Sequence, residues 1–174
     1  MIQSTQTFVF FSKLKESCLF ISRKCDGAMA EAGSISKKTM GLLVAVAREA
    51  SEAAYCPYSK FRVGAAVLTD DGLVFAGCNI ENASYGLTLC AERVAVFRAI
   101  AEGARRIRAV VICTPTQSPT APCGACRQVI REFGQNAEIV SVCDGPDTLR
   151  RTLGELLPDS FGSESLEADP EKDT

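Results

Sequence analysis

Apolar residues recur along the chain with two different periods, which divide it into helices and strands. From Met40 to Ala54 they return every three or four residues, and this predicts a helix with Ser36 as N-cap, ended before Pro57. Shorter helical segments are predicted over residues 90–102, 123–133 and 153–157. Apolar, β-branched runs predict strands over residues 61–69, 73–78, 107–114 and 138–143, with a weaker strand over 148–152.

The order of these elements predicts the fold class. Asp71-Gly72 lies between the first two strands and is typical of a hairpin turn, whereas the later strands alternate with helices. A crossover that contains a helix joins parallel strands, so the second half of the sheet is expected to be parallel, with helices on both faces. We therefore expect an α/β protein, a three-layer α/β/α sandwich around a central mixed sheet of about five strands.

The two ends of the chain differ in composition from the patterned region between them. The first 38 residues carry six basic against three acidic residues, are rich in Ser and Thr and have no clean period. Residues 1–35 are therefore expected to be a disordered or targeting extension, or a segment upstream of a start at Met29. Residues 36–166 are expected to form one domain, and residues 167–174 an acidic tail. No apolar run is long enough to span a bilayer, so we expect a cytoplasmic protein, with organellar targeting as the alternative.

Composition narrows the possible chemistry more than charge does. The net charge is -2, the chain has no histidine, and it has nine cysteines. A Ser-His-Asp triad, a histidine base and any histidine-ligated metal are therefore excluded. An odd number of cysteines also cannot pair completely within one chain. A reducing compartment and a thiolate metal site become the hypothesis to test.

Three cysteines lie at the predicted starts of two helices. Cys123 and Cys126 follow Pro122 and are three residues apart, so a helix that begins there places both sulfurs on one side of its first turn. The positive end of a helix favours the thiolate form that zinc binds. Cys90, at the other helix start, could supply a third ligand. Three protein ligands leave zinc a fourth position for water, as in catalytic sites.

Glu92 lies two residues after Cys90, close enough to share such a site without ligating the metal. Its carboxylate is the candidate general acid and base, because no histidine is present to move protons. Three thiolates and one Zn²⁺ sum to a negative charge. A guanidinium bonded to a sulfur, from Arg93 or Arg127, would offset that charge.

Two other interpretations of the cysteines remain open at this stage. Cys123 and Cys126 alone could form a redox pair of the thioredoxin type. A structural zinc would need a fourth ligand, and Cys113 or Cys143 could be proposed, although both lie in apolar strands and suit the core. No function is assigned to the remaining cysteines, Cys18, Cys25, Cys56 and Cys78.

The motifs Cys90-Ala91-Glu92-Arg93 and Pro122-Cys123-Gly124-Ala125-Cys126 resemble the signature of the zinc-dependent nucleoside and nucleobase deaminases. Over about residues 42–166 the chain is similar to the small homotetrameric cytidine deaminases. Further segments that carry this resemblance are Tyr55-Cys56-Pro57-Tyr58-Ser59, Gly77-Cys78-Asn79-Ile80-Glu81-Asn82-Ala83 and Glu155-Leu156-Leu157-Pro158. The resemblance implies a cytidine deaminase-like fold and the hydrolysis of cytidine and 2′-deoxycytidine to uridine and 2′-deoxyuridine, with release of ammonia, in pyrimidine salvage.

The same resemblance implies a role for each matching residue of the metal site. Cys90, Cys123 and Cys126 would bind one Zn²⁺ per subunit, Glu92 would shuttle protons, and Arg93 would compensate the thiolate charge. The residues implied to contact the nucleoside are Phe61, Asn79, Glu81, Tyr85, Ala91 and Phe161. Of these, Asn79 and Glu81 would hydrogen-bond the ribose 3′-hydroxyl, and Phe61 would pack on the pyrimidine. Tyr85 and Phe161 would reach a neighbouring subunit's site in a homotetramer.

Three rival functions share the cysteine motifs: a deaminase of another aminopyrimidine such as blasticidin S, an RNA- or DNA-editing deaminase, and an inactive homologue. The segment Asn79-Ile80-Glu81-Asn82 matches ribose binding and argues against the first. A polymer needs a positive face, and a net charge of -2 supplies little, despite Arg105, Arg106 and Arg108. We therefore expect a small nucleoside substrate and neither nucleic acid nor membrane as partner.

Overall fold

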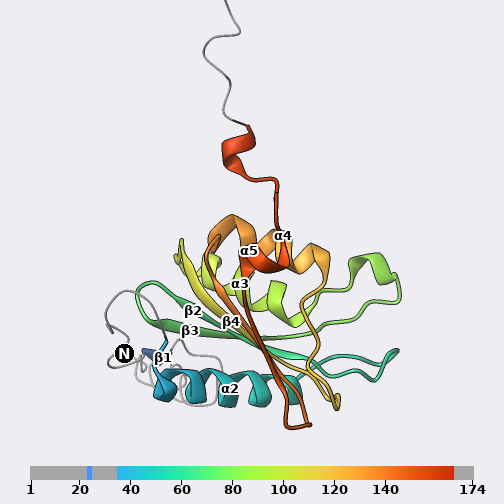
Figure 1. Ribbon diagram of the computed structural model, residues 1–174. Helices are drawn as coiled ribbons and strands as arrows, with labels where there is room; N and C mark the ends of the chain where they lie inside the picture. Colours follow the sequence, from blue (N-terminus) through green and yellow to red (C-terminus); the bar gives the residue numbers. More distant parts are fainter. Residues whose placement is uncertain (1–22, 25–34, 167–174) are drawn as a thin grey trace, which may run out of the picture.

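A single sheet lies between two layers of helices in the computed structural model, which describes residues 23–24 and 35–166 (Figure 1). The strands, in spatial order, are β1 (Arg23–Lys24), β3 (Leu73–Cys78), β2 (Gly64–Thr69), β4 (Ile107–Cys113), β5 (Glu138–Val142) and β6 (Thr148–Thr152). Helix α2 (Lys37–Glu52) covers one face, and the helices on the other are α3 (Ala91–Ala101), α4 (Gly124–Phe133) and α5 (Leu153–Leu156). The predicted three-layer α/β/α sandwich is confirmed, and the two-residue β1 adds a sixth strand.

The sheet is mixed, but it is less parallel than the sequence predicted. Strands β4 and β5 are parallel and are joined through α4, as expected. All other neighbours within the described residues are antiparallel, including β5 and β6. The expectation of a parallel second half is wrong for β6, because a short loop without a helix joins it to β5 and so returns the chain antiparallel.

The chain ends assigned by sequence to a separate extension and tail lie mostly outside the described residues. Of the predicted extension 1–35, only residues 23–24 and 35 are described, and the two-residue strand pairs with β3 at Leu73 and Val74. The predicted tail 167–174 is outside the described part of the chain. Among the residues that are described, no helix is long and apolar enough to cross a bilayer.

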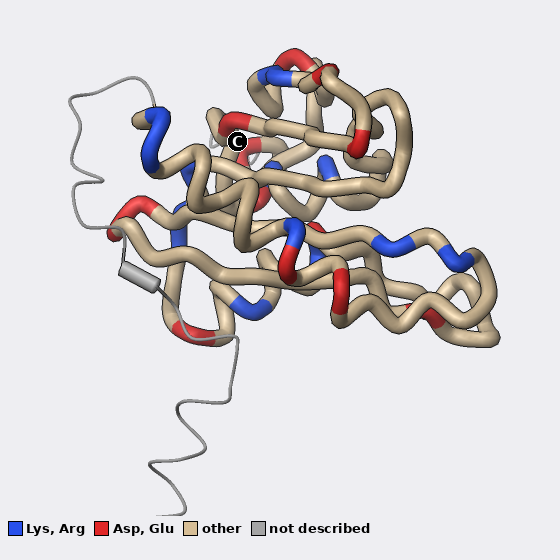
Figure 2. Tube along the Cα trace, turned by 90° about the horizontal axis from the view of Figure 1, so that it is seen from below, with Lys and Arg blue, Asp and Glu red and all other residues tan. Residues whose placement is uncertain are grey.

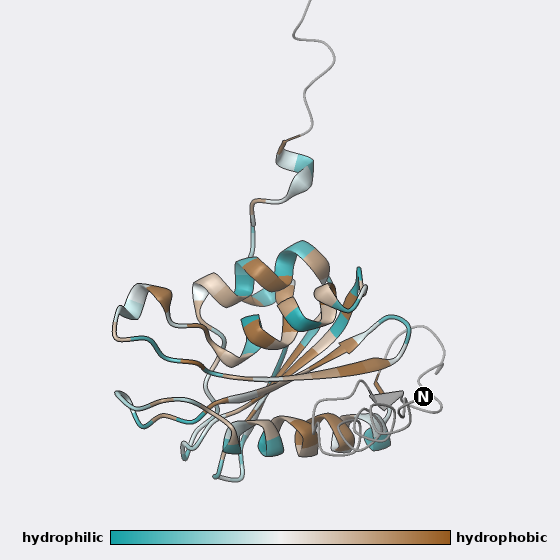
Figure 3. Cartoon of the chain, turned by 180° about the vertical axis from the view of Figure 1, so that it is seen from behind, coloured by the Kyte–Doolittle hydropathy of each residue, from teal (hydrophilic) through white to brown (hydrophobic). Residues whose placement is uncertain are grey.

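Strand β2 contributes side chains to the hydrophobic core on each face of the sheet, because successive side chains of a strand point to opposite faces. Ala65 and Val67 pack in the core under α3 and α4, whereas Ala66 and Leu68 pack in the core under α2. All six residues of β2 are buried. The apolar colouring of the strands between the helix layers shows the same arrangement (Figure 3). Both faces of this strand are thus covered, as its continuous apolar run predicted.

Gly77 of β3 lies directly against the first turns of α3. A Cβ atom at this position would be 2.4 Å from the Ala95 nitrogen and 2.6 Å from the Ala91 oxygen, both backbone atoms that cannot give way independently of the helix. The close approach of strand and helix therefore requires glycine.

Replacement of Gly77 by Ala is expected to lower the free energy of unfolding by about 2 to 3 kcal/mol, because the added methyl group must displace α3. Urea denaturation of the metal-loaded protein measures this loss. Gly41→Ala in α2 is the matched control, since a Cβ there meets nothing within 4 Å. The control is expected to raise stability by up to about 1 kcal/mol. Equal stability of Gly77→Ala and the original chain would contradict the packing described.

Candidate metal and nucleoside site

The first turns of α3 and α4 bring three cysteine thiols together. Cys90 is the N-cap of α3 and Cys123 the N-cap of α4, with Cys126 in the first turn of α4. The Sγ atoms of Cys90 and Cys123 are 3.9 Å apart, and those of Cys123 and Cys126 are 3.5 Å apart. All three lie within 4.8 Å of one another and form the one such cluster among the residues described.

The spacing of these sulfurs fits one zinc ion. A tetrahedral zinc with Zn–S bonds of about 2.3 Å holds its sulfur ligands about 3.8 Å apart, which agrees with both distances. The thiols are free rather than joined in a disulfide. Three thiolates at two helix N-termini form a donor set of the kind that zinc prefers, with a fourth position left over.

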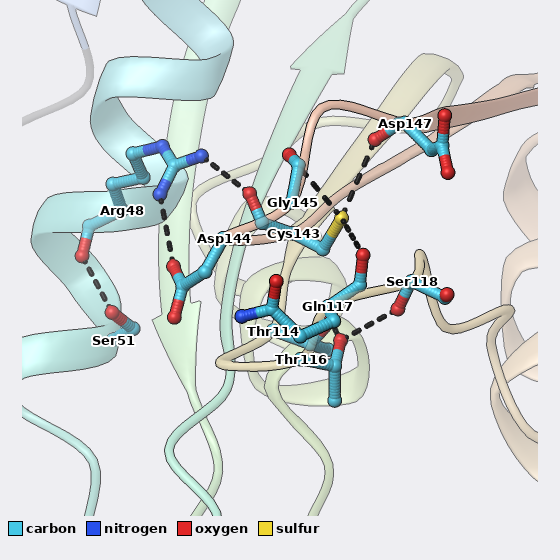
Figure 4. A network of polar contacts seen from close by, with 10 residues as sticks. All are labelled: Arg48, Ser51, Thr114, Thr116, Gln117, Ser118, Cys143, Asp144, Gly145 and Asp147. Atoms are coloured by element: carbon cyan, nitrogen blue, oxygen red, sulfur yellow. Dashed lines mark hydrogen bonds and ion pairs between the residues drawn. The ribbon is translucent and has the colours of Figure 1, made fainter.

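Neither cysteine proposed as a fourth ligand joins the cluster. Cys113 is packed in the core under α2, on the opposite side of the sheet from α3. Cys143 is also buried, and its Sγ lies 3.4 Å from the Asp147 carbonyl oxygen and 3.6 Å from the carbonyl oxygens of Gln117 and Gly145 (Figure 4). Both behave as the small interior residues that their strands suggested, so the closed structural site is not supported.

Arg93 supplies the positive charge beside the thiols. Its Nη2 donates to the Thr88 carbonyl at 2.8 Å and lies 3.7 Å from the Cys90 Sγ. A hydrogen bond from the Cys126 thiol, together with Arg93, lowers the pKa of the Cys90 thiol to about 5. The same shared proton, together with burial, raises the pKa of Cys126.

Arg127, the alternative sulfur partner suggested by the sequence, has a different role. Its Nε donates to the Pro122 carbonyl at 2.8 Å and its Nη1 to the Leu156 carbonyl at 2.7 Å. It therefore ties the residue before Cys123 to the end of α5. Of the two arginines suggested by the sequence, Arg93 contacts a sulfur, whereas Nε and Nη1 of Arg127 are directed at backbone carbonyls.

Glu92 lies in the first turn of α3 and is only 5 % exposed. Burial raises the pKa of its carboxyl group, and the negative charge of Cys90 adds to this effect. A carboxyl group with a raised pKa takes up and releases a proton closer to neutral pH than an exposed one. Its place beside the thiol cluster agrees with the role predicted for it.

Asn79 and Glu81 are buried side chains that hold the segment 58–63 in place. The Asn79 amide accepts from the Val63 nitrogen at 2.9 Å and donates to the Phe61 carbonyl at 2.8 Å. These side-chain bonds replace strand pairing, so the strand expected from residue 61 begins only at Gly64.

The Glu81 carboxylate accepts from three groups at the start of this segment. They are the Tyr58 nitrogen at 2.9 Å, the Ser59 nitrogen at 3.2 Å and the Ser59 hydroxyl. The hydroxyl contact is the main cause that lowers the pKa of Glu81. Sequence reasoning missed Ser59, because nothing in its neighbourhood distinguishes it from an ordinary turn serine.

The aromatic residues named from the sequence are largely exposed. Phe61, Tyr85 and Phe161 are 36 %, 64 % and 58 % exposed. Tyr85 lies in a 3₁₀ turn (η1, Tyr85–Leu87) and packs edge-on against Tyr58, with ring centroids 5.8 Å apart. Ala91, in contrast, is fully buried beside Glu92. The structure thus brings Phe61, Asn79 and Glu81 together through hydrogen bonds, while Phe161 lies on a segment that stands away from the body (Figure 1).

Comparison with known proteins identifies what this arrangement resembles. A family model described as the cytidine and deoxycytidylate deaminase zinc-binding region matches residues 24–143. The chain is 46 % identical over 125 residues to a cytidine deaminase of Sporosarcina psychrophila, covering 71 % of this chain and 92 % of that protein. It is 47 % identical over 127 residues to a cytidine deaminase of Halalkalibacterium halodurans, and the match covers 72 % of this chain and 96 % of that protein.

Solved structures resemble the fold as well as the sequence. The crystal structure of cytidine deaminase from Burkholderia pseudomallei superimposes with a TM-score of 0.68 at 48 % identity, covering 73 % of this chain and all of that one. The similar region spans nearly the whole of each relative. The residues 24–143 that the family model matches contain Cys90, Glu92, Cys123 and Cys126.

Proposed function

Because the chain belongs to the cytidine and deoxycytidylate deaminase family, we propose that it hydrolyses cytidine and 2′-deoxycytidine to uridine and 2′-deoxyuridine with release of ammonia. It is a zinc-dependent hydrolase, and a role in pyrimidine salvage follows from this reaction. The observation that carries the proposal is the buried Glu92 carboxyl beside three converging thiols.

The residues of the metal site divide the chemical work. Cys90, Cys123 and Cys126 would hold one zinc per subunit, and the zinc would supply the Lewis acidity that makes water a nucleophile near neutral pH. Glu92 takes one proton from the attacking water and delivers it to N3 of the ring. It then takes the proton of the new C4 hydroxyl and gives it to the amine, so that the C4–N bond breaks, ammonia leaves and C4 becomes the carbonyl of uridine. Arg93 balances the negative charge of the thiolates through its contact with Cys90.

The nucleoside lies, in this proposal, between the metal site and the segment that Asn79 and Glu81 hold. These two side chains bind the ribose 3′-hydroxyl while keeping their backbone contacts, so the subsite is formed before the nucleoside arrives. Phe61 packs on the pyrimidine, and Ala91 lines the same pocket. The domain boundaries at residues 36 and 166 belong to the same proposal.

A homotetramer completes the sites in this proposal. Its support is the set of large apolar side chains left exposed around the segment 55–87, namely Tyr55, Tyr58, Phe61, Ile80, Tyr85 and Leu87, together with Phe161 on the C-terminal segment. Exposed apolar residues gathered in this way mark an interaction surface. Tyr85 and Phe161 then reach a neighbouring subunit's pocket.

A nucleoside, rather than a polymer, suits the charge of the surface. Lys and Arg positions are interspersed with Asp and Glu along the chain instead of forming one basic face (Figure 2). Nucleic-acid binding depends on a continuous positive surface. A cytoplasmic location agrees with the seven unpaired cysteines of the described residues, since thiols remain free in reducing compartments.

The test is to incubate purified, zinc-loaded protein with cytidine and to follow the loss of ultraviolet absorbance and the release of ammonia. One zinc per chain and equal amounts of uridine and ammonia are expected. Blasticidin S in place of cytidine and a low-salt gel shift with RNA and single-stranded DNA are run beside it. Deamination of blasticidin S alone, or a shift of either polymer, would favour a rival function, and zinc binding without ammonia release would indicate an inactive homologue.

A further inference from the structure

Helix α4 carries two zinc ligands at its start and, further along, a set of contacts to the C-terminal arm, which we define as residues 160–166. The Gln128 Nε2 donates to the Phe161 carbonyl at 3.0 Å. The Arg131 Nε donates to the Ser160 hydroxyl at 2.7 Å, and its Nη2 forms an ion pair with Glu164. The helix that positions half of the metal site therefore also fixes the path of the arm.

Burial differs sharply between the two sides of this contact. Arg131 is 8 % exposed, although it is a charged residue, whereas Phe161 is 58 % exposed and Leu166 73 % exposed. A buried guanidinium is tolerated only where its donors find acceptors, so Arg131 depends on the hydroxyl and the carboxylate of the arm. The arm's polar side is thereby held on the body, and its apolar side chains are left facing outward.

The backbone of the turn before the arm also indicates that the arm is held in one position. Asp159 has φ of 51°, in the left-handed region that residues other than glycine rarely adopt. Asp adopts this region more readily than most non-glycine residues, and the contacts of Ser160 and Glu164 to Arg131 that follow directly after it help to hold the turn. From these contacts with α4 the segment extends outward beyond the helix layer (Figure 1).

We propose that Arg131, assisted by Gln128, is a positioning residue that presents Phe161 to the nucleoside site of a second copy of this chain. The inference rests on the proposed function. An arm that is already fixed loses little conformational freedom when the neighbouring site closes around nucleoside, and this favours binding. Arg131 touches no reacting atom and acts only through the position of Phe161.

Arg131→Ala is therefore expected to raise KM for cytidine about tenfold while kcat changes less than about threefold. Zinc content and the sedimentation coefficient should stay those of the original protein. Arg131→Lys, which keeps the charge opposite Glu164 but loses the fork that also reaches Ser160, should raise KM by a smaller factor. Arg151→Ala is the matched control, because this exposed arginine of β6 donates to the Arg150 carbonyl and makes no hydrogen bond or ion pair with residues 160–166 within the described part of the chain. It should leave KM unchanged.

Mixed assemblies show whether the arm acts on another subunit. The Arg131→Ala chain is co-expressed with a Glu92→Gln chain, which has an intact arm but, under the proposed function, no turnover of its own. The working sites then belong to Arg131→Ala subunits and can receive Phe161 from Glu92→Gln neighbours. KM should return toward the original value in the mixture.

A KM that stays high in the mixture would overturn the proposal, as would an unchanged KM in Arg131→Ala alone. If Arg131→Ala does not assemble, Ser160→Ala and Glu164→Gln remove one contact each, and both should show a smaller KM increase with the same recovery in mixtures. An original protein that releases no ammonia from cytidine would refute the proposed function, and that result is seen before any variant is compared.

Discussion

Replacing Glu92 by Gln is expected to lower kcat for cytidine by about three to four orders of magnitude while one zinc per chain stays bound. Gln keeps the size and hydrogen-bonding capacity of the side chain but cannot take a proton from water or pass it to the ring. No histidine is present to replace it. Because Glu92 lies in the same turn as Cys90 without joining the thiol cluster, the metal site should be unaffected.

Steady-state kinetics and metal analysis on the same preparation measure this effect. Glu102→Gln is the matched control, since Glu102 is an exposed residue that ends the same helix. Its kcat should equal that of the original protein. A Glu92→Gln variant with more than about a tenth of the original kcat would show that another group carries the protons.

Replacing Cys126 by Ala is expected to lower zinc affinity by at least about 100-fold and to abolish turnover at ordinary zinc concentrations. The Cys126 Sγ is buried between the N-termini of α3 and α4, so no water-exposed group can take its place. A ligand that binds only the folded chain stabilises it. The melting temperature should therefore fall to that of the chelator-treated original and should no longer respond to chelator.

Cys113→Ala is the control for this experiment, because Cys113 is equally a buried thiol but lies under α2. It should cost about 1 kcal/mol of stability through the lost packing and keep its zinc. Full zinc occupancy in Cys126→Ala after dialysis against chelator would contradict the three-thiol site. Loss of zinc from Cys113→Ala would instead revive the fourth-ligand interpretation.

The parts of the site that were predictable from the sequence are those set by local rules. Cys90, Cys123 and Cys126 could be assigned to helix starts because apolar periodicity and Pro122 mark where α3 and α4 begin, and a helix start fixes the direction of the side chain beside it. The buried strands could also be predicted from a local pattern, because a continuous apolar run indicates a strand that is covered by other elements on both faces.

What could not be predicted depends on contacts between distant segments. The antiparallel pairing of β6 depends on a loop that carries no helix, and the late start of β2 depends on an amide at Asn79, 16 residues away from Val63. Ser59 gains its contact with Glu81 only when two loops meet. Arg127 was a candidate sulfur partner by spacing alone, and only the fold shows its guanidinium directed at Pro122 and Leu156.

Because β2 contributes to the core on each face of the sheet, we expect the two helix layers to unfold locally together. Alternate residues of one strand hold α2 on one side and α3 on the other, so loss of either helix layer exposes one face of the strand on which the other layer is packed. The two layers then exchange their amide hydrogens with solvent through one cooperative event rather than two. Zinc held at α3 and α4 would slow exchange in α2 as well, although α2 contributes no ligand, and a metal on one face of the sheet would protect the opposite face.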